Sequence, residues 1–352
     1  MSLLRKRVSQ IAEQVMETVN RGPISPPPLS TPLVLSTGST LLDLAISGGR
    51  IKGGGIPPGI LVEIFGPSGA GKTALLAEIG ASCQSQGGVV RFLDPEARLD
   101  QEYTKIYGLS LTESGNEYYR PDTVVELIDH IITFKVPEDS PIGVVAADSI
   151  AALSTDIEME KGDKMGMKRA KDFSEGLRKV CRLISQDNRL VLFTNQIRES
   201  MAEGGFGPKE TTPGGKALPF YSSLRLRVGP AFPSSKIKKE ITQGKIKITK
   251  VIGIHSTVDV VKSSIDEPYR SASIYIIFGY GVDDIRANLE YVKKMTGATR
   301  FKVGDSNFQS MNEAIQFCEE KELQGKLRED VIDIWEGIES QMRVSRTPKI
   351  RK

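Results

Sequence analysis

The chain has 352 residues, and its 47 lysines and arginines against 44 aspartates and glutamates give a net charge of only +3. With 39% hydrophobic and 26% charged residues it has enough apolar material for a large core, which excludes disorder along the whole chain. We find no run of about 18 apolar residues, no secretory signal and no paired cysteine spacing, so we expect a cytoplasmic protein without a membrane partner.

Residues 1–33 are predicted to form an N-terminal helix followed by a linker. Val8, Ile11, Val15 and Val19 recur at the three- and four-residue spacing of an amphipathic helix over residues 3–20. The prolines that follow cannot continue a helix, because proline lacks a backbone donor and fixes φ. Such a tethered helix has to pack either on the main domain or on a neighbouring copy of the chain.

The central region, residues 34–284, alternates short apolar runs with helical patterns. The runs are typical of buried parallel strands, and they lie at residues 61–65, 89–93, 142–147 and 190–193. Residues 245–261 instead alternate polar and apolar side chains, as half-buried antiparallel strands do. We therefore predict an α/β fold with a central, mostly parallel sheet.

The pattern becomes helical beyond this region. Leu327, Val331, Trp335, Ile338 and Met342 share one helical stripe, which predicts a small C-terminal domain over residues 285–342. The final segment, 343–352, contains several lysines and arginines and no acid, so we expect a basic tail.

A complete phosphate-binding motif of the form G-x-x-x-x-G-K-T follows the first apolar run. It comprises Gly66, Pro67, Ser68, Gly69, Ala70, Gly71, Lys72 and Thr73. A strand before it and a helix after it suit a loop whose backbone N–H groups surround a phosphate. Lys72 can then reach the β- and γ-phosphate oxygens of ATP, and the Thr73 hydroxyl can bind Mg²⁺.

Three polar side chains end other predicted strands on the same edge of the sheet. Asp148 can accept a Mg²⁺-bound water, or simply cap its strand. Glu96 lies where a water-orienting group is needed, although an acid at such a position, taken alone, is more often a solvated loop residue. Gln196 can donate to a γ-phosphate oxygen and release it after hydrolysis, or form a turn.

Two glycine-containing basic segments follow the strands that end at Asp148 and Gln196. The candidate DNA contacts in the first segment are Lys164, Met165, Lys168, Arg169 and Lys171. The second segment, residues 198–216, contributes Arg198, Phe206, Gly214 and Gly215. Cations that neutralise phosphates, with apolar side chains between stacked bases, suit single-stranded DNA. A solvated charged surface remains the alternative for the first segment.

Together these motifs resemble the RecA recombinase family from Leu35 to Asp283. The similarity includes Ser36-Thr37-Gly38, Asp148-Ser149-Ile150-Ala151-Ala152-Leu153 and Asn195-Gln196-Ile197-Arg198. It implies a RecA-type P-loop ATPase core, an N-terminal helix that docks on the next subunit and a small C-terminal α(+β) domain.

The resemblance also implies roles for individual residues. Glu96 would activate the attacking water, Gln196 would sense the γ-phosphate and Phe220 would relay that state between subunits. Asp100 and Tyr103 would contact adenine. Residues 156–168 and 198–217 would form two DNA-binding loops, with Lys171, Arg178 and Arg198 at the phosphates of the DNA.

The sequence departs from the family pattern at several positions. Two lysines usually reach the neighbour's ATP, whereas this chain supplies only Lys262, with Ser264 at the second position, so we expect slower turnover. Phe278 replaces a second adenine-lining aromatic and lacks its hydroxyl. A lysine-rich extension within residues 230–250 has no role that the sequence assigns.

The implied function is an ATP- and Mg²⁺-dependent recombinase that forms a helical filament on single-stranded DNA and exchanges strands with homologous duplex DNA. Two alternatives are a ring-shaped ATPase or helicase built on the same core, and a DNA-binding filament or mediator without strand exchange.

Overall fold

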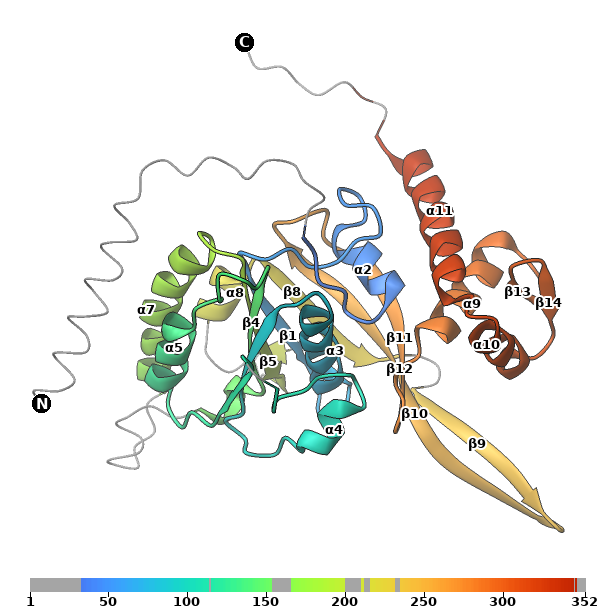
Figure 1. Ribbon diagram of the computed structural model, residues 1–352, viewed down its shortest axis with the longest axis horizontal. Coiled ribbons are helices and arrows are strands. Elements are labelled where there is room, and N and C mark those ends of the chain that lie inside the picture. Colours follow the sequence, from blue (N-terminus) through green and yellow to red (C-terminus); the bar gives the residue numbers. More distant parts are fainter. Residues whose placement is uncertain are drawn as a thin grey trace, which may run out of the picture.

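The protein is described from a computed structural model that covers residues 33–113, 115–153, 166–199, 210–211, 216–231, 235–344 and 346. The predicted N-terminal helix at 3–20, its linker and all of the basic tail except Arg343, Val344 and Arg346 lie outside the described residues. Figure 1 shows a central sheet with helices on both faces, a long two-stranded projection and a smaller group of C-terminal helices.

The central sheet has ten strands, nine of which follow the order β12-β11-β10-β8-β1-β5-β4-β2-β3. The six strands from β8 to β3 are parallel, and β10, β11 and β12 continue the sheet in antiparallel fashion. Their bounds are β1 Leu61–Gly66, β2 Val89–Leu93, β3 Glu117–Tyr119, β4 Gly143–Ala147, β5 Arg189–Gln196, β8 Leu224–Pro230, β10 Ile246–Ser263, β11 Ser271–Ile277 and β12 Gly281–Val282. The predicted α/β class and mostly parallel sheet are confirmed.

Alternate residues of each central strand supply two separate hydrophobic cores, because successive side chains of a strand point to opposite faces. Val62, Phe92 and Leu192 contribute to the first core, together with helices α2 Thr40–Ser47 and α3 Lys72–Ser85. Their strand neighbours contribute to the second core, which is covered by α5 Val124–Thr133, α7 Gly166–Ile184 and α8 Ala217–Tyr221. The inner strands β1, β2, β4 and β5 are therefore mostly apolar, as the sequence indicates, although β1 carries Glu63 and β2 carries Arg91.

The tenth strand, β9 Lys236–Gln243, pairs only with β10 and forms the projection in Figure 1. Residues 246–254 of β10 pair with β9, whereas residues 253–259 pair with β11 and residues 256–263 pair with β8 inside the main sheet. One strand thus runs from the exposed projection into the body of the protein.

The C-terminal elements surround a third core that includes Leu289, Val303 and Val331. They are the helices α9 Asp284–Thr296, α10 Met311–Glu320 and α11 Gln324–Met342 and the short hairpin of β13 Phe301–Val303 and β14 Ser306–Phe308. Leu44 of α2 joins this core, so the C-terminal elements pack directly on the helix that follows the Ser36-Thr37-Gly38 motif.

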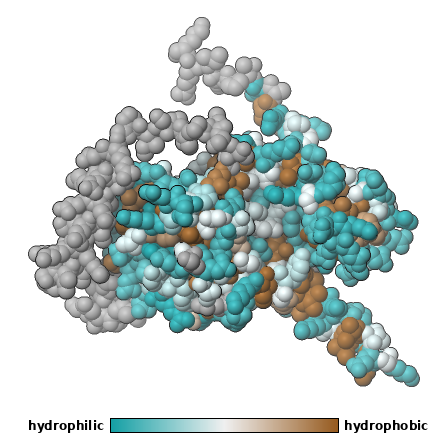
Figure 2. All heavy atoms as spheres, viewed as in Figure 1, coloured by the Kyte–Doolittle hydropathy of each residue, from teal (hydrophilic) through white to brown (hydrophobic). Residues whose placement is uncertain are grey.

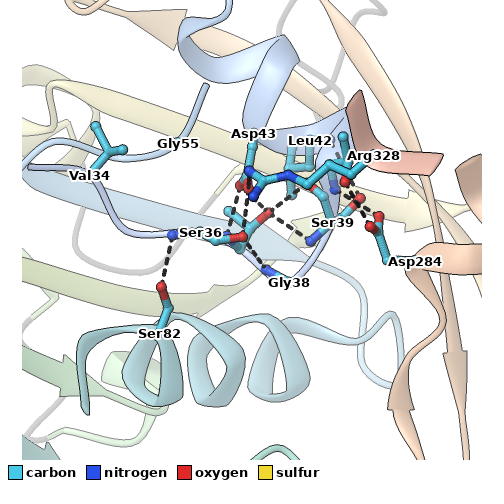
Figure 3. Close-up of polar contacts among 12 residues, drawn as sticks. Val34, Ser36, Gly38, Ser39, Leu42, Asp43, Gly55, Ser82, Asp284 and Arg328 are labelled. Atoms are coloured by element: carbon cyan, nitrogen blue, oxygen red, sulfur yellow. Dashed lines mark hydrogen bonds and ion pairs between the residues drawn. The ribbon is translucent and has the colours of Figure 1, made fainter. Parts of the chain in front are cut away.

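A polar junction links α2 to the C-terminal helices (Figure 3). Asp43, which is almost fully buried, accepts hydrogen bonds from Ser36 Oγ at 2.5 Å and from the Thr37 N–H at 2.8 Å. Its Oδ2 lies 3.8 Å from Nη2 of Arg328 on α11. Asp284 of α9 accepts hydrogen bonds from both the N–H and the hydroxyl of Thr40 at 2.7 Å. Burial raises the pKa of Asp43 to about 6, although its hydrogen bonds act in the opposite direction.

Candidate nucleotide-binding site

The phosphate-binding loop connects β1 to α3 at the carboxyl end of the parallel strands. Two of its glycines are required by close packing: a Cβ on Gly66 would lie 2.0 Å from the Val228 carbonyl oxygen, and one on Gly71 would lie 2.3 Å from Ile276 Cδ1. Gly71 also has a φ of +100°, a conformation that other residues rarely adopt. Gly66 and Gly71 are therefore explained by the fold as well as by the predicted ligand.

The Lys72 ammonium group lies inside this loop. Its Nζ donates to the carbonyl oxygens of Gly66 at 3.0 Å and Pro67 at 2.8 Å. Burial lowers the pKa of Lys72, while the nearby carboxylates of Asp148 and Glu96 oppose that shift. These contacts hold the ammonium at the position from which it can exchange carbonyl oxygens for phosphate oxygens.

Asp148 follows β4 and accepts two hydroxyl hydrogen bonds. Thr73 Oγ1 donates to its Oδ2 at 2.5 Å, and Thr194 Oγ1 donates to its Oδ1. Burial raises the pKa of Asp148, and the bonds from Thr194 and Thr73 hold the increase back. The predicted pair of Thr73 and Asp148 is thus brought together from elements 75 residues apart.

The donor set around Asp148 fits Mg²⁺ rather than a metal enclosed by protein ligands alone. Among the described residues there is no cluster of three or more histidine, cysteine, aspartate or glutamate side chains that could hold a metal. Mg²⁺ in nucleotide sites is commonly bound by one or two carboxylates, waters and substrate phosphates, so one hydroxyl and one carboxylate are sufficient. Thr73 and Asp148 would hold it.

Glu96 and Gln196 also meet at this edge of the sheet. Gln196 Nε2 donates to Glu96 Oε1 at 3.4 Å, and Arg98 Nη1 lies 3.2 Å from the other oxygen of Glu96. Glu96 lies in the turn after β2, whereas Gln196 ends β5. The structure therefore joins the two side chains whose proximity the sequence could only suggest.

A pocket of about 620 Å³ joins the phosphate-binding loop to the polar residues at the strand ends. Its lining includes loop and strand-end residues, namely Ser68, Gly69, Lys72, Thr73, Glu96, Asp148 and Gln196. A second group in the same lining consists of Asp100, Tyr103, Ile254, Ile276 and Phe278. The second group offers apolar and aromatic surface for a nucleobase. Asp100 caps α4 Gln101–Lys105 by accepting from the Glu102 N–H at 2.9 Å, which gives its carboxylate a structural role in the same place.

Several functional residues were missed by sequence reasoning. Ile254 and Ile276 line the pocket from antiparallel strands that are remote in sequence, and no local motif marks them. A buried carboxylate, Glu63, accepts from Asn195 Nδ2 at 3.0 Å and from Arg225 Nε at 2.6 Å. The available signal for this network was the charge of Glu63 inside the apolar run of β1. The network holds Asn195, and with it the end of β5 beside Gln196.

Lys262 and Phe220 lie outside this pocket. Lys262 Nζ donates to the carbonyl oxygens of Pro219 at 2.8 Å and Phe220 at 2.9 Å. The Phe220 ring is 74% exposed and makes an edge contact with Tyr221 at a centroid distance of 5.0 Å. Phe220, the predicted coupling residue, and Lys262, the lysine predicted to reach the neighbour's ATP, are therefore adjacent on one subunit.

The candidate DNA contacts are described only in part. Lys171 and Arg178 are exposed on α7, and Lys171 Nζ lies 3.8 Å from Glu175. Lys168 and Arg169 belong to α7 and Arg198 begins β6 Arg198–Glu199, which pairs with β7 Glu210–Thr211, but their side chains are outside the description. Lys164, Met165, Phe206, Gly214 and Gly215 lie outside the described residues.

Comparison with known proteins gives a consistent result. The family model described as the RecA N-terminal domain matches residues 30–283. Protein RecA of Acholeplasma laidlawii is 35% identical over 309 residues, which cover 84% of this chain and 86% of the relative. Protein RecA of Thermus aquaticus is 38% identical over 254 residues, covering 72% and 69% respectively. Of the helices in the described residues, none is long and apolar enough to cross a membrane.

Proposed function

Because this chain belongs to the RecA family of recombinases, we propose that it is a DNA-dependent ATPase that assembles into a helical filament on single-stranded DNA and exchanges strands with homologous duplex DNA. We also propose that residues 34–284 are the ATPase core, that residues 1–33 mediate assembly, and that residues 285–342 form a separate C-terminal domain. ATP and Mg²⁺ are the proposed cofactors.

One observation carries the ATPase proposal: a phosphate-binding loop, a carboxylate with its hydroxyl partner and a glutamate–glutamine pair surround one pocket. The same constellation supports phosphoryl transfer to water. Lys72 binds the β- and γ-phosphates, while the loop N–H groups and the N-terminus of α3 stabilise their negative charge. Bound Mg²⁺ would supply further neutralisation of the phosphate oxygens.

Glu96 is the proposed general base of the reaction. It lines the same pocket as the loop and can orient a water for attack on the γ-phosphorus and accept its proton. In the structure Gln196 donates to Glu96, and in the ATP-bound state the same amide can donate to a γ-phosphate oxygen. After loss of that phosphate, Gln196 again donates to Glu96. The end of β5 therefore has two arrangements, one with Gln196 bonded to the γ-phosphate and one with Gln196 bonded to Glu96.

The link from hydrolysis to DNA rests on chain connectivity. The candidate DNA segments begin just beyond Asp148 and Gln196, and both of these residues line the pocket. A change in the position of Gln196 therefore acts directly on the start of the second segment. We propose that ATP favours the DNA-binding arrangement of both segments and that hydrolysis releases it.

The arrangement of Lys262 and Phe220 supports a shared site between subunits. Neither side chain reaches the pocket of its own chain, although Phe220 is strongly exposed and Lys262 is held beside it. We propose that both face the ATP of the adjacent subunit, with Lys262 stabilising the charge of the transition state. Ser264 supplies no second cation there, which accounts for the slower turnover that we expect.

The test compares ATP hydrolysis by the full chain with and without single-stranded DNA. A marked rise in rate on DNA addition is expected, and an unchanged rate would contradict DNA-dependent catalysis. A second measurement compares DNA binding with ATP, ADP and no nucleotide. Equal affinity in all three states would refute the coupling, and a strand-exchange assay with matched and unmatched duplexes separates a recombinase from a DNA-binding mediator.

A further inference from the structure

The projection formed by Lys236–Gln243 of β9 and residues 246–250 of β10, here called the ribbon, is not used by the proposed ATPase. Between residues 236 and 250 the sequence contains six lysines and a single acid, Glu240. The described strands are exposed on both faces along most of this length, and Figures 1 and 2 show the ribbon extending clear of the body.

The register of the two strands divides these side chains between the two faces of the ribbon. Cross-strand partners of an antiparallel pair share one face, and successive pairs alternate. Ile241 pairs with Ile248, and the next pair on that face is Lys239 with Lys250. Ile246 lies further toward the tip on the same face, opposite Gln243. This isoleucine face therefore combines three exposed apolar side chains with two opposed cations.

The opposed lysines are an unfavourable arrangement in the protein alone. Like charges placed directly opposite each other on a sheet are destabilising. The ribbon's acid lies on the other face, where Glu240 pairs with Lys247 at 2.5 Å. Within the described part of the chain, neither Lys239 nor Lys250 has a carboxylate at ion-pair distance. The isoleucine face is thus cationic and is not neutralised internally.

The isoleucines on this face are also unusually exposed for their size. The exposed fractions are 53% for Ile241, 67% for Ile246 and 42% for Ile248. An apolar protein interface over these side chains would bury Lys239 and Lys250 without partners, which costs several kcal/mol per charge. A polyanion, by contrast, supplies negative charge beside apolar surface.

We propose that the ribbon is an arm that binds double-stranded nucleic acid, with its lysines on the phosphates and its isoleucines in the groove. A two-stranded ribbon fits the major groove of a duplex, and arms of this kind also insert isoleucine side chains between base steps in the minor groove. Eight residues of β9 extend over about 27 Å, which matches about eight phosphates along one strand.

The arm is built rigidly into the protein. The strand that carries Ile246, Ile248 and Lys250 continues without interruption into the main sheet, where residues 256–263 pair with β8. A shift of register between Val251 and Gly253 marks an irregularity at the base of the ribbon, and such bulges increase the local twist. Because the ribbon lies outside the nucleotide pocket, duplex binding by it requires no ATP.

The experiment measures binding of the full chain to a fluorescent duplex of about 20 base pairs, without nucleotide, over a range of salt concentrations. The double variant Lys239→Gln/Lys250→Gln should weaken binding and lower the slope of log affinity against log salt by about 2, because each phosphate contact contributes about 0.9. Lys239→Arg/Lys250→Arg should retain the slope. The matched control is Lys52→Gln/Lys135→Gln, two exposed lysines of the body, for which the slope should stay unchanged.

An unchanged slope in the glutamine variant would overturn the proposal, as would an equal loss in the control variant. A change in sedimentation of the glutamine variant without DNA, together with unchanged duplex binding, would instead assign the ribbon to contacts between copies of the chain and would also overturn it. Folding is checked by thermal melting, where removal of the opposed charges should leave the melting temperature equal or higher. ATP-dependent binding to single-stranded DNA is measured separately, so failure of either proposal can be recognised independently.

Discussion

The buried Glu63–Arg225 pair offers a quantitative test of how the nucleotide site is supported. Glu63 is fully buried on β1, and only the Arg225 guanidinium and the Asn195 amide are hydrogen-bonded to its carboxylate among the described residues. Removing one partner of a buried ion pair costs about 3–5 kcal/mol, since the remaining charge has no compensation. The Arg225 side chain is 17% exposed, so we expect Arg225→Leu to lower the free energy of unfolding by about 3 kcal/mol, near the lower end of that range.

The companion variant separates loss of charge pairing from loss of packing. In Arg225→Leu/Glu63→Gln no buried charge remains, and the glutamine still accepts from Asn195, so we expect recovery of about 2 kcal/mol. The matched surface control is Arg227→Leu, two residues further along β8, where Nη1 lies 3.9 Å from Asp259 Oδ2. This variant should lower the free energy of unfolding by less than about 1 kcal/mol.

The assay is urea unfolding followed by far-ultraviolet circular dichroism, with the slope of the transition compared between variants. The reasoning is wrong if Arg225→Leu and the double variant unfold at the same urea concentration, because the uncompensated carboxylate would then carry no cost. An equal loss in Arg227→Leu would show that any arginine of this strand acts by packing alone.

Three further predictions concern the site and its junction with the C-terminal helices. Lys72→Ala should abolish ATP binding in equilibrium dialysis, and unchanged affinity would contradict the phosphate assignment. Glu96→Gln should keep ATP binding but reduce hydrolysis about 10²- to 10⁴-fold, and a normal rate would remove it as the base. Burial raises the pKa of Asp43 from 3.8 to about 6, so the carboxylate favours folding when protonated and opposes it when ionised. Relative to Asp43→Asn, the free energy of unfolding should therefore fall by up to about 3 kcal/mol as pH rises from 4 to 7, and a flat difference would refute this.

The sequence by itself indicated the positions of four buried strands of the core and the identity of the phosphate loop. Strands buried on both faces are mostly apolar, so β1, β2, β4 and β5 appear as near-continuous apolar runs. Glycine, lysine and threonine at fixed spacing have a local physical reason, because one loop and one helix end supply all the contacts to a phosphate.

Only the tertiary structure decided what surrounds that loop. The contact of Gln196 with Glu96 and the presence of Ile254 in the pocket lining depend on which strands become neighbours, and strand order is a long-range property. The register of the ribbon likewise decided that Lys239 faces Lys250, since a shift of one residue would have placed them on opposite faces. Composition shows that lysines are numerous there, but pairing across the sheet is what concentrates their charge on one surface.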